Sequence, residues 1–400
     1  MPSIPDLTPR RAVVLCLVFG AILAGRTYQL LPRWRRFDLL AVAAVLFFSI
    51  SYGLNTDFKG FYHRLAVLGM DWGGPYVLAR ALLRDRSAVR AALLPLAMSS
   101  VVLAFLAVYE CRMATRLAPQ LWNMVGIDVA ITKQHGYWRW GFLRAAATFD
   151  GPICLGTFFA TVTPLMGLWA LLEPRRRWMT AVAALACVAG CVAALSRGPM
   201  LVLAAVLLTF LCVAFWRRSV FVMGLCVIAL ASPLLVQMAM EEVRVTQTDL
   251  DVTGNTSSGR YRVALLLLYG RQIACVGPWG NPSIVGSEFE RAWSIDNAYL
   301  FFFITGGWVG GGVFCLIVVG LLYIGARGIS HTVGQERKVH AAILASFAAI
   351  AGCMSNIWFA PSYAPFFWIV AALVLNQTHV PLARLLAMRR GYFARASTPV

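Results

Sequence analysis

Long runs of apolar residues constrain the fold of this chain more than any other feature. A helix needs about 20 residues to cross a bilayer, and nine runs, with their flanks, come close to that length. Backbone N–H and C=O groups in hydrocarbon need partners within the protein, so only helices and closed barrels span a membrane. Barrel strands alternate apolar and polar residues, whereas these runs are apolar on every side, so the sequence predicts an all-α fold. The runs cover residues 39–54, 93–109, 153–172, 179–195, 201–216, 220–238, 298–324, 341–355 and 366–375.

The composition leads to the same class of protein. Hydrophobic residues make up 60% of the chain and charged residues only 13%, and the mean hydropathy is +0.72. Soluble domains carry about 25% charged residues, so this chain has too few polar side chains to cover a water-facing surface. We therefore expect a lipid bilayer as its main surroundings. The prediction is one integral membrane domain over residues 1–400, a polytopic transmembrane helical bundle of about 10–12 spans.

The net charge of +18 raises the possibility of nucleic-acid binding, because a strongly basic domain is typical of such proteins. The arginines, however, lie in short gaps between the apolar runs, at 33–36, 84–90, 175–177 and 217–218, and after the last run at 384–395. This distribution is typical of the cytoplasmic loops of membrane proteins. We interpret it as a signal of topology and of contact with anionic lipids, and expect no nucleic-acid partner.

Two weaker apolar runs decide the number of spans. The run at 12–31 is interrupted by Arg26, and the run at 61–83 contains charged residues and a Gly-Gly-Pro break. Counting both gives eleven spans and places Arg10 and Arg11 on the outer side, whereas omitting 61–83 places the basic cluster at 33–36 there. We predict eleven spans. With the basic gaps in the cytoplasm, residues 239–297 form one large periplasmic loop.

No metal or other cofactor is expected from the sequence. The ten cysteines include no C-x-x-C pair and no Cys/His spacing typical of a metal site. Asp249 and Asp251 have the D-x-D spacing of some metal-dependent sugar transferases, but two acids at that spacing occur readily by chance in a polar loop.

Arginines on the predicted outer side are the first candidates for function. Arg197 lies between two apolar runs, where a charge costs about 2.5–3.5 kcal/mol near the bilayer centre. It is either a corner arginine that reaches lipid phosphate or a functional residue, and we favour the second. Arg260 and Arg262 in the large loop would complete a diphosphate clamp with Arg197, because guanidinium groups bind phosphate through two parallel hydrogen bonds. Taken alone, they are almost equally well explained as a solvated pair.

Asp296 and Asn297 form a second candidate, at the point where the loop meets the run 298–324. Asp296 is either an N-terminal helix cap or a catalytic carboxylate. The next residues include Tyr299 and glycines at 306, 307, 310, 311 and 312, whose spacing predicts close helix packing.

Four segments together resemble the O-antigen ligase and O-antigen polymerase superfamily, over about residues 90–360. Residues 144–152 (RAAATFDGP) resemble the family's R-A-x-G-T-F-x-H-P segment, and 196–198 (SRG) match its S-R-G corner. Residues 258–262 (SGRYR) with 277–280 (GPWG) resemble its loop arginine and downstream turn, and 296–306 resemble its H-N-x-Y-L…G element. Family ligases carry a functional histidine where this chain has Asp296, which favours a polymerase over a ligase.

The resemblance implies a metal-independent glycosyltransferase of the bacterial inner membrane, with an active site facing the periplasm. It would polymerise an O-antigen or exopolysaccharide, moving an oligosaccharide from undecaprenyl diphosphate to a sugar hydroxyl of another lipid-linked repeat. A chain-length regulator and a flippase are possible partners of such an enzyme. The residues assigned to catalysis are Asp296, Arg197 and Arg260. The residues assigned to substrate binding are Arg144, Arg262, Asn297 and Tyr299.

Two alternatives stay open. One is a ligase that transfers finished glycan to lipid A core or to protein. The other is a polysaccharide or lipid transporter, which usually shows two related halves and broken helices at the midplane. No half-repeat and no pair of matching Gly/Pro interruptions is visible here, and the polar residues gather in the predicted outer loops. The sequence therefore favours an enzyme.

Overall fold

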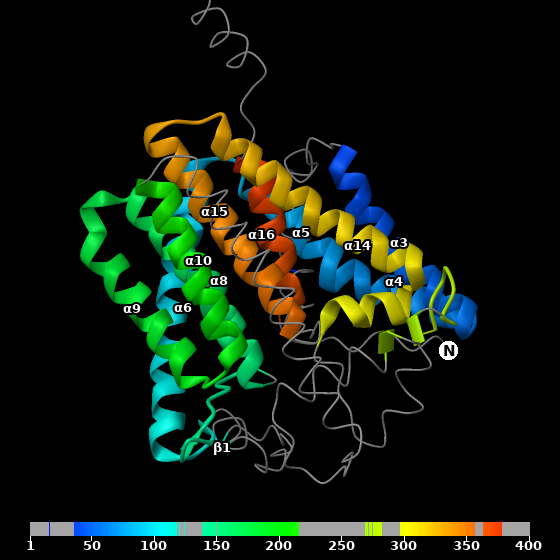
Figure 1. Cartoon of the computed structure of the whole chain (residues 1–400), viewed down its shortest axis with the longest axis horizontal. Helices are drawn as coiled ribbons and strands as arrows, with labels where there is room; N and C mark the ends of the chain where they lie inside the picture. The colour runs from blue at the N-terminus through cyan, green and yellow to red at the C-terminus, as the bar shows by residue number, and fades with distance from the viewer. Residues whose placement is uncertain are drawn as a thin grey trace, which may run out of the picture.

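The computed structural model of the chain is a bundle of helices (Figure 1). Five of its helices are long and apolar enough to cross a membrane, judged by length and composition over the described residues. The predicted all-α helical membrane protein is confirmed at this level. The run 220–238, almost all of 12–31 and most of the loop 239–297 lie outside the described part. The structure describes residues 16, 36–117, 120, 124, 138–149, 151–215, 269–270, 272–273, 275–281, 297–356 and 363–377.

Helices account for nearly all of these residues, and the strands form one short hairpin. The helices are α3 (Arg36–Asn55), α4 (Phe58–Leu68), η1 (Gly69–Gly73), α5 (Gly74–Leu82), α6 (Arg86–Met113), α8 (Pro152–Leu172), η2 (Pro174–Arg176), α9 (Arg177–Ala193), α10 (Arg197–Phe215), α14 (Ala298–Ser330), α15 (Gly334–Cys353), η4 (Met354–Asn356) and α16 (Ala364–Gln377). The antiparallel hairpin is β1 (Trp138–Arg139) and β2 (Phe142–Leu143).

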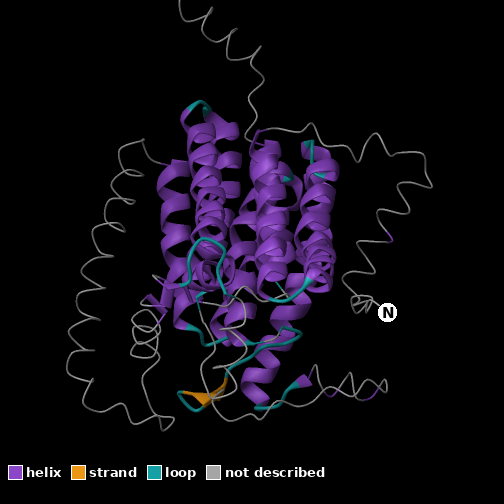
Figure 2. Ribbon diagram, turned by 90° about the vertical axis from the view of Figure 1, so that its right-hand side faces the viewer, coloured by secondary structure: helices purple, strands orange, loops and turns teal. Residues whose placement is uncertain are grey.

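The helices lie side by side, and the two ends of the bundle differ in chemistry (Figure 2). One end, here called the basic end, joins the starts of α6 and α15 to the end of α8. There Arg86 pairs with Glu336, and the Arg90 Nη1 atom lies 3.5 Å from Glu173 Oε2. The opposite end, here called the loop end, carries the β1–β2 hairpin, orange in Figure 2, and the corner between α9 and α10. The basic gaps at 84–90 and 175–177 therefore share one end, in agreement with the charge pattern.

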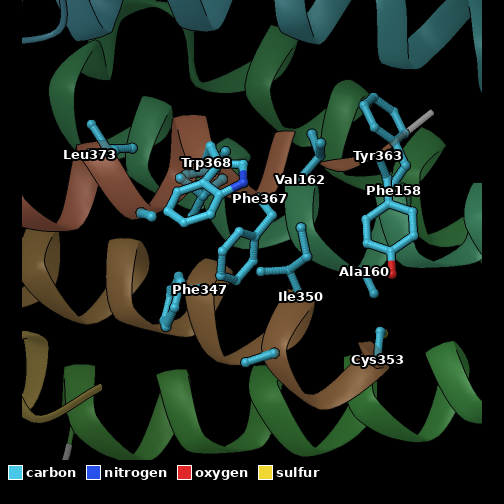
Figure 3. Close-up of a cluster of buried hydrophobic side chains, with 14 of the residues drawn as sticks. Phe158, Ala160, Val162, Phe347, Ile350, Cys353, Tyr363, Phe367, Trp368 and Leu373 are labelled. Carbon is cyan, nitrogen blue, oxygen red and sulfur yellow. The ribbon is translucent and has the colours of Figure 1, made fainter. Parts of the chain in front are cut away.

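The centre of the bundle is formed by α8, α15 and α16. Figure 3 shows side chains of all three helices in one buried cluster, among them Val162 of α8, Phe347 of α15 and Phe367 of α16. The Phe347 and Phe367 rings lie 5.6 Å apart between centroids. α8 is buried on nearly all its faces, which explains why its sequence is apolar all round and lacks an amphipathic pattern.

Residues 58–82 are helical throughout, although the Gly-Gly-Pro sequence predicts a break there. The helix widens into one π-helical turn at η1, where the Gly74 N–H bonds to the Gly69 carbonyl five residues earlier. Pro75 then falls in the first turn of α5, where its missing N–H matters least. Trp72 in the widened turn is buried, with its ring 5.5 Å from that of Phe48 on α3. The weak apolar run thus packs as a full member of the bundle.

A buried ion pair ties α3, α5 and α16 together at the basic end. Arg80 donates from Nε to Asp38 Oδ1 at 2.9 Å and from Nη2 to Asp38 Oδ2 at 3.1 Å. Tyr76 also donates to Asp38, and Arg80 donates to the Asn376 side chain on α16. The side chains of Arg80 and Asp38 are only 3% and 0% exposed. Both charges are buried, but they compensate each other, and the hydrogen bonds of Tyr76 and Asn376 add to that compensation.

α14 is broken at Gly307, near the loop end. Gly307 has φ 64° and ψ −166°, which no helix residue adopts. The turn Gly277–Asn281 fills the gap: the N–H groups of Trp308 and Val309 bond to the carbonyls of Gly277 and Pro278, both at 3.2 Å. The Asn281 N–H bonds to the Ile304 carbonyl at 2.8 Å on the other side of the break. The predicted close packing holds for Gly306 and Gly310, whose Cα atoms face Phe48, but Gly307 has the different role of interrupting the helix.

Asp38→Asn is expected to destabilise the fold strongly, because the Arg80 charge is then left buried without a carboxylate. We expect the free energy of unfolding in mixed micelles to fall by about 3–5 kcal/mol. The control is Glu336→Gln, which breaks the Arg86–Glu336 pair, where the side chains are 46% and 42% exposed; its expected loss is under about 1 kcal/mol. If the two variants prove equally stable, the buried pair contributes no more to the free energy of unfolding than the exposed pair.

Gly307→Ala is expected to disrupt the junction between α14 and the Gly277–Asn281 turn. A Cβ atom at position 307 would lie 2.3 Å from both Gly280 N and Pro278 O. We expect a loss of about 2–4 kcal/mol from backbone strain and overpacking, measured as free energy of unfolding. Gly312→Ala is the matched control, since nothing lies within 4 Å of its Cβ position. It should leave stability unchanged or slightly raised, because alanine favours helix over glycine; similar losses in both variants would contradict the described junction.

Candidate functional site

The loop end holds every predicted site residue that the structure describes. These are Arg144, Arg197, Asn297 and Tyr299. Asp296, Arg260 and Arg262 lie outside the described residues, so their roles stay predictions.

Glu110, at the loop end of α6, fixes the backbone that follows Arg144. Its carboxylate is fully buried. Oε2 accepts hydrogen bonds from the N–H groups of Ala146 at 3.0 Å and Ala147 at 2.9 Å, and Oε1 accepts one from Leu117 at 3.1 Å. Ala147 has φ 47°, in the left-handed region, and these bonds hold it there. A buried carboxylate with three N–H donors is a satisfied structural anchor.

The segment after Arg144 lies directly against the corner that carries Arg197. The Ala145 N–H bonds to the Ala193 carbonyl at 3.1 Å, and Arg139 donates from Nη1 to the Leu195 carbonyl at 2.7 Å. Leu195 has φ 46°, which turns the chain sharply between α9 and α10. Two of the four motif segments, far apart in the sequence, therefore meet at the loop end.

Arg197 is the first residue of α10, and its side chain is exposed. Its guanidinium carbon lies 5.7 Å from the centre of the Trp140 ring. Arg139, half-buried, lies 6.0 Å from the same ring. Burial and the nearby positive charge of Arg197 lower the pKa of Arg139. Two cations thus lie near one aromatic ring beside the start of a helix.

Sequence reasoning missed Arg139, Trp140 and Glu110. The alternation Trp138-Arg139-Trp140 was a usable signal for the first two, because arginine among aromatic residues is common in binding surfaces. Glu110 carried a weaker signal, as an acid at the very end of an apolar run.

Asn297 and Tyr299 have structural contacts of their own. The Asn297 side chain caps α14, with Oδ1 accepting the Leu300 N–H at 3.1 Å. The N-terminal cap of α14 is therefore Asn297, and not Asp296, for which that role was considered from the sequence. The Tyr299 hydroxyl donates to the Ala351 carbonyl at 2.8 Å, which joins α14 to the end of α15.

An apolar groove of about 540 Å³ runs along the bundle between α10, α14 and α15. Tyr299 and Ser355 line it towards the loop end, and Ile329 and Ala341 line it towards the basic end. No charged side chain is among its described lining residues. α10 contributes Val202 to the lining, about 7.5 Å along the helix axis from Arg197. Arg197 thus precedes the groove-lining residues of α10, on the loop-end side.

The loop end thus has two neighbouring cations, and the apolar groove lies along the bundle; together they suit an anionic group attached to a long apolar chain. Among the described residues, no three His, Cys, Asp or Glu side chains gather closely enough to hold a metal ion. No family model, no curated protein and no solved structure matches this chain. The motif segments and their geometry are thus the observations that bear on its function.

Glu110→Gln is expected to loosen the segment that follows Arg144, because the amide nitrogen of glutamine accepts no hydrogen bond. We expect a loss of about 1.5–3 kcal/mol in the free energy of unfolding, and faster hydrogen exchange at the Ala146 and Ala147 amides. Glu173→Gln makes the same chemical change at a partly exposed site and should alter neither. Unchanged exchange at both alanines in Glu110→Gln would contradict the anchor role.

Proposed function

We propose that this chain is a glycan polymerase of the bacterial inner membrane, with its active site at the loop end and facing the periplasm. Its substrates in this proposal are oligosaccharides carried on undecaprenyl diphosphate. The observation that carries the proposal is the meeting of the segments around Arg144 and Arg197 at one end of an apolar bundle. The resemblance of four segments to the O-antigen ligase and polymerase superfamily supports it.

The reaction joins one lipid-linked repeat to another. An acceptor sugar hydroxyl attacks the anomeric carbon of the donor, its C–O bond to the diphosphate breaks, and a new glycosidic C–O bond forms. The hydroxyl proton passes to a base, for which we propose Asp296, and the carrier diphosphate leaves as an anion. Because negative charge gathers on the leaving group, fixed cations stabilise the transition state more than the ground state. Arg197 takes this role in the proposal, with Arg260 or Arg262.

The apolar groove would hold the isoprenoid chain of the carrier. Its lining is apolar along the bundle, and α10, which lines it, begins at Arg197. A lipid with its chain in the groove would thus present its diphosphate near this arginine. Arg144, Asn297 and Tyr299 would shape the sugar side of the site, in part through the backbone contacts described above.

Arg197→Gln is expected to reduce polymer formation by about a hundredfold, because it removes a charge that stabilises the leaving diphosphate. Arg197→Lys should keep part of the activity, since lysine supplies the charge but not the two-pronged hydrogen bonding. Polymer length and yield are measured on gels, at matched protein levels, with Arg86→Gln at the basic end as the control. Full-length polymer at normal yield from Arg197→Gln would refute the assignment.

Product analysis in a deletion strain separates polymerase from ligase. A polymerase deletion loses polymer and retains single repeats, which is the expected result. Accumulation of lipid-linked polymer would instead identify a ligase.

A further inference from the structure

The β1–β2 hairpin is an unusual place for a large aromatic residue. Its two-residue turn consists of Trp140 and Gly141, with φ 52° and 79°. Turns with positive φ at both positions favour asparagine, aspartate or glycine, and a tryptophan there is strained. Strained residues of this kind are concentrated at functional sites. In this conformation the Trp140 ring lies close to two arginines, Arg139 and Arg197.

Both guanidinium groups lie close to this ring, and a hydrogen bond holds that of Arg139. Arg139 donates to the Leu195 carbonyl at 2.7 Å, so the hairpin is joined to the α9–α10 corner. That bond occupies one of the five N–H donors of Arg139. The guanidinium carbons of Arg139 and Arg197 lie 6.0 Å and 5.7 Å from the ring centre.

The two positive charges have no carboxylate partner among the described residues. The ion pairs described above belong to arginines 80, 86 and 90 at the basic end. Glu110, the buried acid of this end, accepts only backbone N–H groups in its described contacts. The N-terminus of α10 adds further positive potential beside Arg197. Like charges held together repel each other, and an anion between them removes the repulsion.

We propose that Arg139 and Arg197, which both lie beside the Trp140 ring, form a single binding site for a diphosphate group. Guanidinium groups bind phosphate oxygens through paired hydrogen bonds, and two of them match the charge of a diphosphate. Arg139 thereby becomes a substrate-binding residue. The identification of this diphosphate as that of a lipid carrier rests on the proposed function, whereas the site itself rests on the contacts of the two arginines.

The test measures binding without requiring polymerisation. The full-length protein in detergent is titrated calorimetrically with farnesyl diphosphate and, separately, with inorganic pyrophosphate. Arg139→Gln is expected to weaken farnesyl diphosphate binding about tenfold or more, as loss of a charge-assisted hydrogen bond implies. Arg112→Gln is the control, since Arg112 is exposed in the last turn of α6 at the same end. It should change affinity by less than about twofold.

Unchanged farnesyl diphosphate affinity in Arg139→Gln overturns the proposal, even if the variant melts at a lower temperature, because bracing the corner would then be its whole role. Binding of nanodiscs rich in phosphatidylglycerol, with no binding of either diphosphate, also overturns it, since the site would then recognise bulk lipid headgroups. A loss of diphosphate binding in Arg139→Gln supports the site. It does so even if the protein proves unable to make polymer, in which case only the proposed function fails.

Discussion

Backbone amides in hydrocarbon must find hydrogen-bond partners inside the protein, and this requirement decides where the chain can leave regular helix. Within the described residues, we consider two places where the backbone departs from regular α-helix. At η1 the helix widens by one residue, so that the Gly74 N–H reaches the Gly69 carbonyl and Pro75 falls in the first turn of α5. At Gly307 the helix breaks, and the carbonyls of a second segment replace the missing partners. In the first case the helix itself keeps the bond, and in the second another segment of the chain supplies it.

The buried charged side chains also have partners inside the protein. Asp38 and Arg80 are buried at the basic end, but each satisfies the other. Glu110 is buried at the loop end, and backbone N–H groups surround its carboxylate. Arg139 and Arg197 differ, because their described contacts are with a carbonyl and an aromatic ring. An anionic ligand would give these two arginines the negatively charged partner that Asp38 gives Arg80.

The helices could be predicted from the sequence because the length and charge of an apolar run determine them locally. α8, for example, begins and ends within one residue of the run 153–172. The break in α14 could not, since it depends on contacts between residues 277–281 and 304–309 that no local pattern contains. The sequence suggested Asp296 as a possible cap of α14, but Asn297 holds that position, because aspartate and asparagine cap helices about equally well and sequence alone does not fix the first helical residue. Arg139 was missed because its partners, Leu195 and Arg197, are distant in sequence.

The broken helix also bears on the choice between enzyme and transporter. In transporters, the half-helix ends at such breaks point towards substrate or ions and use their unpaired backbone groups to bind them. Here the chain itself occupies those groups, with Trp308 and Val309 bonded on one side of the break and Ile304 on the other. The Ser51 hydroxyl also lies 2.5 Å from the Thr305 carbonyl. The break thus fastens the turn Gly277–Asn281 to the bundle and leaves little backbone for a ligand, so the binding site that we propose lies at the arginines of the loop end instead.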